Sequence, residues 1–185
     1  MKRTLTIAAL VALGAVAATL SINAKSTNVP TKQQQIARGE YLVTIGGCND
    51  CHTPLKMGAK GPEPDMSRML SGHPQHVPMP PAPKSNGPWL WSGAATNTAF
   101  AGPWGVSFAR NLTPDEHTGI GIWSEEMFIN TIRSGKHWGV SRPILPPMPW
   151  FNYAKMSDED LRSVYAYLRT LKPVKNQVPD AILAQ

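Results

Sequence analysis

The chain has 185 residues, of which 42% are hydrophobic, with 18 prolines, two cysteines and a formal net charge of +6. This modest positive charge comes without an arginine-rich run or a groove-reading motif, which excludes a nucleic-acid-binding protein. Once residues 1–24 are set apart as an export segment, the remainder is long enough for one domain.

The N-terminal segment has the features of an export signal. Lys2 and Arg3 form a basic start, the run from Leu5 to Leu20 is almost wholly apolar, and the small residue Ala24 offers a processing site. We therefore predict a signal peptide over residues 1–24 and an exported, periplasmic protein whose single domain covers 25–185. The apolar run is also close to the ~17–25 residues that span a bilayer, so an uncleaved anchor in the inner membrane is an alternative.

The first helix is predicted over residues 31–46. Gly39 inside it costs about 0.5–1 kcal/mol relative to alanine, which makes sense where another helix crosses closely. Gly46 and Gly47 end the helix and turn the chain. Apolar residues recur along it at helical spacing: Ile36, Tyr41, Leu42 and Ile45.

The five residues after this helix contain both cysteines of the chain, in the order Cys48-Asn49-Asp50-Cys51-His52. This order is the attachment signature of a c-type haem. A short helical turn brings two thiols to the two vinyl groups on one edge of a porphyrin, and an imidazole nitrogen of His52 can then ligate the iron. The sequence holds no second copy of the motif, so we predict one covalently attached haem c with its iron.

Three other uses of the cysteine pair are weaker. A disulfide across two residues closes a short loop and gains little entropy. A structural zinc site needs four ligands, and the sequence has no second Cys or His pair with suitable spacing. A thiol-redox pair follows a strand, whereas this pair follows a helical pattern. Haem attachment is the favoured interpretation, with thiol redox as the main alternative.

Residues 53–109 differ in composition from the rest of the chain. They hold ten of the 18 prolines, and residues 71–109 carry a single formal charge, that of Lys84. This proline density argues against long helices and central strands. The segment is nevertheless too aromatic for a disordered linker. We predict an ordered but irregular insert over about 63–109 that lies over the haem or the helices, with a mobile excursion at 74–88 as an alternative.

Two further helices are predicted in the second half of the chain. Ser124 supplies a hydroxyl N-cap for residues 124–135, and acidic residues follow it in the first turn, where the helix dipole favours negative charge. A second capped, acidic start at Ser157 opens a helix that Pro173 stops. Its apolar residues recur at helical spacing: Leu161, Val164, Tyr165, Leu168 and Leu171.

A haem iron held by one histidine needs either a second protein ligand or an open position. Met148 is the candidate for this sixth ligand, because prolines on both sides restrict its backbone and lower the entropy lost on ordering. His137 is its main rival. Met127 and Met156 are better explained as core residues. The other candidates after the motif are Met66, Met69, Met79, His73, His76 and His117.

These features together resemble the class I cytochrome c fold: a helix with Gly39 before the motif, a late Met148-Pro149 element and a final aromatic helix. Segments 111–115, 118–123 and 148–150 are also similar to cytochrome c subunits of bacterial membrane-bound dehydrogenases. The resemblance implies an all-α fold around one haem, in which the first and last helices cross near a glycine and an aromatic residue.

The resemblance also implies roles for single residues. His52 is the proximal iron ligand and Met148 the distal one. Pro62 falls near the family proline whose carbonyl accepts a hydrogen bond from the proximal imidazole, a bond that fixes the tautomer and strengthens ligation. Candidate partners for the haem propionates are Arg110, Asn111 and Trp138.

With protein ligands on both faces of the iron, substrate cannot reach the metal. We therefore predict a periplasmic electron-transfer protein, not an enzyme, that shuttles single electrons through a His/Met-ligated haem c. The expected redox partners are a dehydrogenase, an oxidase or another cytochrome. Lysines around an exposed haem edge could steer acidic partners toward it: Lys56, Lys60, Lys136 and Lys155.

Two other functions stay open. A peroxidase-like or sulfur-oxidising haem enzyme would need a distal acid–base group, for which several histidines of the chain are candidates. An electron-transfer subunit docked to a membrane dehydrogenase would use the apolar Trp/Pro-rich insert as its interface. Neither nucleic acid nor a second haem is expected, and a membrane tether through the N-terminal segment is compatible with either function.

Overall fold

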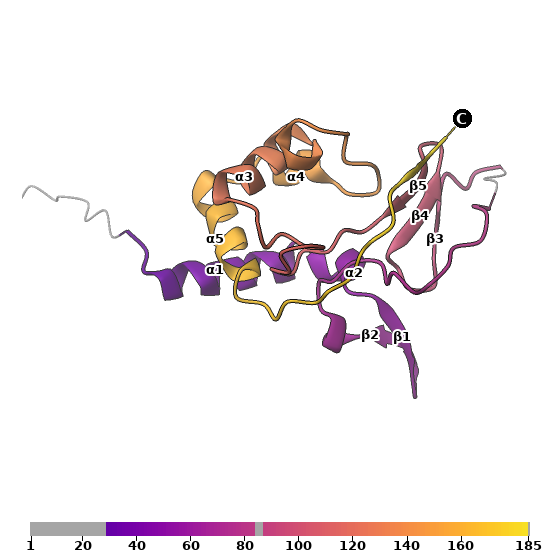
Figure 1. The fold of residues 1–185 in the computed structure, drawn as a ribbon, viewed down its shortest axis with the longest axis horizontal. Coiled ribbons are helices and arrows are strands. Elements are labelled where there is room, and N and C mark those ends of the chain that lie inside the picture. Colours follow the sequence, from indigo (N-terminus) through magenta and orange to yellow (C-terminus); the bar gives the residue numbers. More distant parts are fainter. Residues whose placement is uncertain (1–28, 84–86, 185) are drawn as a thin grey trace, which may run out of the picture.

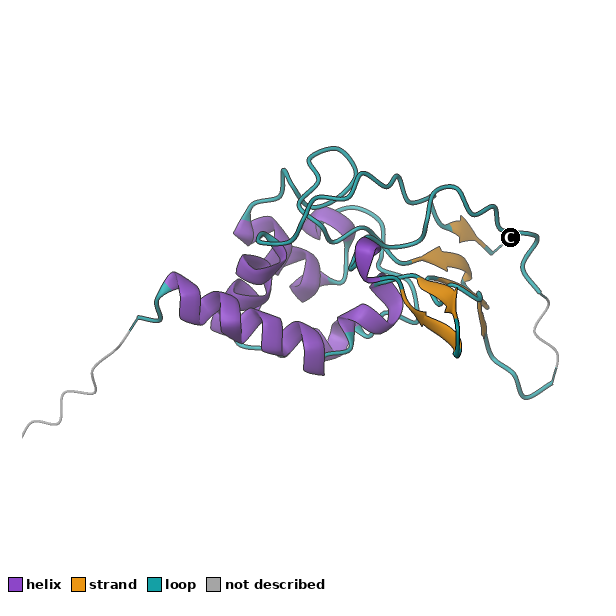
Figure 2. Ribbon diagram, turned by 90° about the horizontal axis from the view of Figure 1, so that it is seen from below, coloured by secondary structure: helices purple, strands orange, loops and turns teal. Residues whose placement is uncertain are grey.

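The computed structural model describes residues 29–83 and 87–184, so the predicted signal peptide or anchor at 1–24 lies outside the described residues. Within those ranges the fold has five α-helices and six strands in two sheets. Helices gather on one side of the molecule and strands on the other (Figure 2). The prediction of an all-α fold is therefore wrong, because the insert folds into strands. None of the helices in the described ranges has the length and apolar character needed to cross a membrane.

The first and last helices cross in close contact, as predicted. Helix α1 (Lys32–Ile45) begins at Thr31, whose hydroxyl accepts the backbone N–H of Gln34 in a capping box. Helix α5 (Asp158–Leu168) packs against it. At the crossing, a Cβ on Gly39 would lie 1.9 Å from the carbonyl oxygen of Ser163 and 2.7 Å from the Cβ of Tyr167. Only glycine allows the two backbones to come this close.

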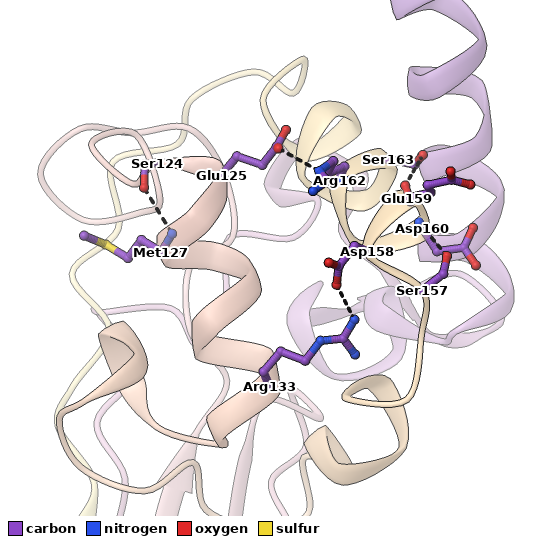
Figure 3. Close-up of polar contacts among 10 residues, drawn as sticks. All are labelled: Ser124, Glu125, Met127, Arg133, Ser157, Asp158, Glu159, Asp160, Arg162 and Ser163. Carbon is purple, nitrogen blue, oxygen red and sulfur yellow. Dashed lines mark hydrogen bonds and ion pairs between the residues drawn. The ribbon is translucent and has the colours of Figure 1, made fainter. Parts of the chain in front are cut away.

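The two later helices begin where the sequence predicts, and α3 also ends there, whereas α5 ends at Leu168, before the predicted stop at Pro173. Helix α3 (Glu125–Ser134) has Ser124 as its N-cap and ends at Gly135, which has a left-handed backbone with φ of 64°. Figure 3 shows how two ion pairs join α3 to α5: Arg133 with Asp158 at 2.6 Å, and Arg162 with Glu125 at 3.2 Å. The buried residues of the resulting core are Val43, Leu70, Ile120, Phe128, Tyr167 and Leu168.

The insert contains most of a four-stranded antiparallel sheet in the order β3-β4-β5-β6. Its strands are β3 (Ser92–Gly93), β4 (Ala99–Gly102), β5 (Gly105–Phe108) and β6 (Ile182–Leu183). The prediction that proline density excludes central strands is wrong, since β4 and β5 are central. Both lie in proline-free stretches, and Pro103 falls in the turn between them, where its missing N–H costs no ladder bond.

Three smaller elements surround the cysteine motif. The motif itself is helix α2 (Cys48–His52), and a hairpin of β1 (Leu55–Gly58) and β2 (Gly61–Pro64) follows it. This hairpin projects away from the helices and from the larger sheet (Figure 1). Helix α4 (Trp150–Tyr153) follows residues 143–149, which we call the Met148 segment. Two short 3-10 turns lie at Met66–Arg68 and His137–Gly139.

The C-terminal segment after α5 is an ordered strap, which we define as residues 174–184. Figure 1 shows it as the yellow segment that runs from α5 past α2 to the sheet. Asn176 anchors it: this fully buried side chain donates to the carbonyl oxygens of Ser71 at 2.7 Å and His73 at 2.9 Å. The strap ends as strand β6, paired with β5.

Candidate functional site

The two cysteines lie on one short helical turn beside a cavity. Gly47, with φ of 65°, turns the chain from α1 into α2, and both cysteines are free thiols. Burial raises the pKa of the Cys48 thiol to about 11, and burial followed by the charge of Asp50 raises the pKa of Cys51. Thiol-redox proteins rely on a lowered cysteine pKa, so this environment argues against that alternative.

His52 is buried at the end of the same turn and is held by a backbone carbonyl. Its Nδ1 lies 2.7 Å from the carbonyl oxygen of Arg110. Because a carbonyl can only accept, Nδ1 carries the proton and the free lone pair is on Nε2, the form that binds a metal. Burial lowers the pKa of His52 despite the opposing effect of this hydrogen bond, so the imidazole stays neutral.

The structure corrects the predicted partner of His52. Pro62 lies in β2, paired with Met57 of the projecting hairpin, and does not line the cavity. The hydrogen bond goes to the backbone carbonyl of Arg110, two residues after the end of β5. No side-chain pattern could have identified this acceptor, because a backbone carbonyl is common to every residue.

A cavity of about 560 Å³ lies beside the motif. This volume is within the ~300–1,000 Å³ that is usual for ligand and cofactor sites. Its walls come from α1, α2, α3 and α5, from residues 107–112, from the Met148 segment and from the strap. Cys48, Cys51, His52 and Met148 all line it, so the fold brings together four of the five predicted site residues. The apolar lining includes Leu42, Val43, Phe128, Ile132, Leu161, Val164 and Leu168.

The cavity also narrows the candidates for a sixth ligand. Among the described methionines and histidines, those that line it in addition to His52 and Met148 are Met156, His117 and His137. The segment before Met148 is fixed where the N–H of Ile144 donates to the carbonyl oxygen of Gly135 at 2.8 Å. After it, Trp150 covers Gly135 so closely that a Cβ there would lie 2.4 Å from the indole.

One end of the cavity carries cationic side chains. Arg110 and Arg142 line it together with His137 and Asp180. Burial, and then the neighbouring Arg110 charge, lower the pKa of Arg142. Burial, followed by the charges of Arg142 and Arg110, lowers the pKa of His137 to about 4. Two guanidinium groups beside one carboxylate leave an excess of positive charge at this end.

The other two residues predicted to meet propionates have different environments. Asn111 is buried, and its amide nitrogen donates to the carbonyl oxygen of Val174 at 2.8 Å, while its Oδ1 accepts from Thr113. It therefore ties the strap to the body of the protein. Trp138 lines the cavity but is 51% exposed, with a left-handed backbone at φ of 56°. It lies at the rim.

The arrangement fits a covalently bound haem. Two thiols, a neutral imidazole with Nε2 free and a thioether line one apolar cavity that has cations at one end. These are the groups that attach, ligate and neutralise a haem c. The sequence missed the carbonyl of Arg110, the side chain of Arg142 and strap residues 177–181, which meet the site only through the fold.

Comparisons with known proteins agree with this geometry. A family model described as "Cytochrome c" matches residues 36–172. The chain is 30% identical over 132 residues to the "Gluconate 2-dehydrogenase cytochrome c subunit" of Pantoea cypripedii, aligning 71% of this chain with 22% of that protein. It is 29% identical over 149 residues to the "Alcohol dehydrogenase (quinone), cytochrome c subunit" of Gluconobacter oxydans (strain 621H), covering 78% of this chain and 24% of that one.

A third relative is the "Fructose dehydrogenase cytochrome subunit" of Gluconobacter japonicus, 28% identical over 159 residues, with 83% of this chain and 26% of that protein aligned. The chain thus spans between 22% and 26% of the length of these three curated relatives.

Proposed function

This chain belongs to the cytochrome c family, and on that premise we propose that it is a periplasmic electron carrier with one covalently bound, His/Met-ligated haem c. The observation that carries the proposal is the shared cavity: Cys48, Cys51 and His52 of one short motif line the same apolar space as Met148, which lies in a distant part of the sequence. Domain 25–185 with its insert at about 63–109 is the unit proposed to act.

The residues have distinct roles in this proposal. Cys48 and Cys51 would hold the haem through thioether bonds, and His52, through Nε2, and Met148 would ligate its iron. The bound haem supplies one-electron chemistry between its ferrous and ferric states. Arg110 and Arg142 would neutralise the haem carboxylates, whose charge would also compensate the repulsion between these two guanidinium groups.

The chain's own residues favour transfer of electrons over catalysis. The hydrogen bond from His52 to Arg110 fixes the imidazole tautomer and increases its basicity toward a metal. The apolar lining would limit the access of water, and Met148 as a ligand would fill the position that a substrate needs. An enzyme would instead need that position open, beside a distal acid–base group.

A second candidate function is that of a subunit docked to a dehydrogenase. The named relatives are cytochrome subunits of gluconate, alcohol and fructose dehydrogenases. The insert presents Trp89 and Trp91 at 76% and 45% exposure next to β3, which is unusually apolar for a free surface. A dehydrogenase is the partner proposed for this face, with an oxidase or a second cytochrome as the electron acceptor. Anchoring by residues 1–24 remains part of this second proposal.

The absorption spectrum of the purified ferric protein tests the ligand set. We expect low-spin iron with a weak long-wavelength band from sulfur–iron charge transfer, and we expect Met148→Ala to lose this band. Met156→Leu and His137→Phe are matched controls, because both side chains line the same cavity. Loss of the band in Met156→Leu, or high-spin iron in the wild-type protein, would contradict the proposed ligands.

The docking proposal has its own test. Trp89→Ser should leave the spectrum unchanged and release a co-purifying dehydrogenase subunit. An unchanged yield of that subunit would remove the insert face from the interface.

A further inference from the structure

The short segment from Ser107 to Arg110, at the end of the insert, contacts both the Met148 segment and His52. At its start, the hydroxyl of Ser107 in β5 donates to the carbonyl oxygen of Pro146 at 2.6 Å, two residues before Met148. Three residues later, the carbonyl oxygen of Arg110 accepts from His52 at 2.7 Å. We propose that Ser107 is a positioning residue for the sixth ligand and that residues 107–110 brace both ligands together. This inference rests on the proposed function, because it assumes that Met148 binds the iron.

The Met148 segment needs an outside support because it has few donors of its own. Between residues 143 and 149, four positions are prolines, which lack a backbone N–H. The segment therefore cannot form a regular ladder or helix that would hold it in place. On its N-terminal side the segment is held by the hydrogen bond from the N–H of Ile144 to the carbonyl oxygen of Gly135. On its C-terminal side the carbonyl oxygen of Pro149 accepts the N–H of Asn152 at 2.9 Å. Between these two bonds, the side chain of Ser107 adds a hydrogen bond from another element.

Ser107 provides this fixation from a rigid position. It is 8% exposed and lies opposite Phe100 in the ladder between β4 and β5, so the sheet fixes its backbone. Its hydroxyl has one proton, and the 2.6 Å distance to Pro146 is far shorter than the 3.4 Å distance to the carbonyl oxygen of Phe100. The proton is thus directed to the Met148 segment. Prolines hold the shape of that segment, and Ser107 holds its place.

This gives the Pro/Trp-rich insert a role in tuning the iron site. Without the hydroxyl, the segment keeps its shape but moves more freely away from the iron, because the carbonyl of Pro146 has lost its side-chain donor. A thioether is a weak ligand, so a small loss of positioning raises the fraction of iron with an open sixth position. An external ligand then binds more tightly in proportion to that fraction.

Imidazole titration of the ferric holoprotein measures the open fraction directly. We expect Ser107→Ala to bind imidazole about fivefold more tightly than the wild-type protein, the effect of one ordinary hydrogen bond. The sulfur–iron band should weaken in parallel. Alanine leaves the backbone pairing of residue 107 with Phe100 intact, so haem attachment and the fold should persist. Intact mass confirms attachment before each titration.

Ser163→Ala is the matched control. Ser163 is also buried, its hydroxyl donates to the carbonyl oxygen of Glu159 at 2.8 Å, and it does not line the cavity. It should lose similar stability in urea but keep its imidazole affinity within about twofold of the wild-type value. Equal imidazole affinities for Ser107→Ala and Ser163→Ala would overturn the inference.

Met148→Ala separates this outcome from failure of the proposed function. If Met148→Ala shows the strongest imidazole binding while Ser107→Ala matches Ser163→Ala, Met148 is the ligand and the proposed positioning role of Ser107 is wrong. If Met148→Ala binds imidazole like the wild-type protein, the ligand assignment itself is wrong, and the inference about Ser107 is wrong with it.

Discussion

The crossing of α1 and α5 at Gly39 supports one wall of the cavity, and Gly39→Ala tests it. A Cβ at this position would lie 1.9 Å from the carbonyl oxygen of Ser163 and 2.7 Å from the Cβ of Tyr167. A carbon–oxygen contact normally needs ~3.3 Å, so the helices must separate by about 1.4 Å. The obstructing oxygen belongs to the backbone and cannot rotate away as a side chain could.

Two effects of opposite sign decide the result. Alanine is favoured over glycine within a helix by about 0.5–1 kcal/mol. Separation of the helices loosens the packing of neighbours such as Val43, Leu161 and Leu168, which are at most 1% exposed. Gaps of 0.5–1 Å lose roughly a quarter to a half of the van der Waals attraction of each contact, and overpacking a core lowers stability by about 1–3 kcal/mol. We expect a net loss of about 2 kcal/mol or more in the free energy of unfolding.

Urea unfolding of the holoprotein, followed by far-UV circular dichroism, measures this loss. Glu40→Ala is the control, since Glu40 is the exposed neighbour on the same helix and should change stability by less than about 0.5 kcal/mol. A Gly39→Ala protein that is as stable as the wild type, or more stable, would refute the reasoning about the crossing.

Two further predictions concern buried polar groups. Burial lowers the pKa of His73, so the unfolded chain takes up a proton first as pH falls below ~6.5, and the free energy of unfolding should fall there by up to about 1.4 kcal/mol per pH unit. In urea unfolding at several pH values, His73→Gln should flatten this dependence, whereas the exposed His76→Gln should not. Asn176→Ala leaves the carbonyls of Ser71 and His73 without their donor and should lower the free energy of unfolding by about 3 kcal/mol in the same assay. An effect no larger than that of the exposed Asn152→Ala would show that the strap is held by other contacts.

Local patterns carried the correct predictions. The N-caps Ser124 and Ser157 were recognisable because a cap acts on the residues directly after it. Gly39 was informative for a similar reason, since a glycine inside a helix indicates close approach of another backbone. The spacing within residues 48–52 was enough to indicate the cytochrome c family.

The failures came from effects that the local pattern does not contain. Strands β4 and β5 are short and lie in a segment whose average proline content is high, so the average concealed two proline-free stretches. The acceptor for His52 is a backbone atom 58 residues away. The strap anchor Asn176 meets Ser71 across 105 residues of sequence. Only the folded chain shows which residues share the cavity.

The corrected fold changes the meaning of the insert. As an irregular cover it would have mattered little to the iron ligands. As part of a sheet whose strand β5 contains Ser107 and is followed by Arg110, it touches the segments of both proposed ligands. The strap completes the enclosure, because the guanidinium of Arg110 donates to the carbonyl oxygens of Val178 at 3.1 Å and Pro179 at 2.9 Å.

The intact mass of the chain, purified from a host that exports it and attaches haem, tests the central claim most directly. We predict a single species heavier than the processed polypeptide by one haem, with the added mass confined to the peptide that contains Cys48 and Cys51. A polypeptide with no added mass and two thiols open to alkylation would contradict the account.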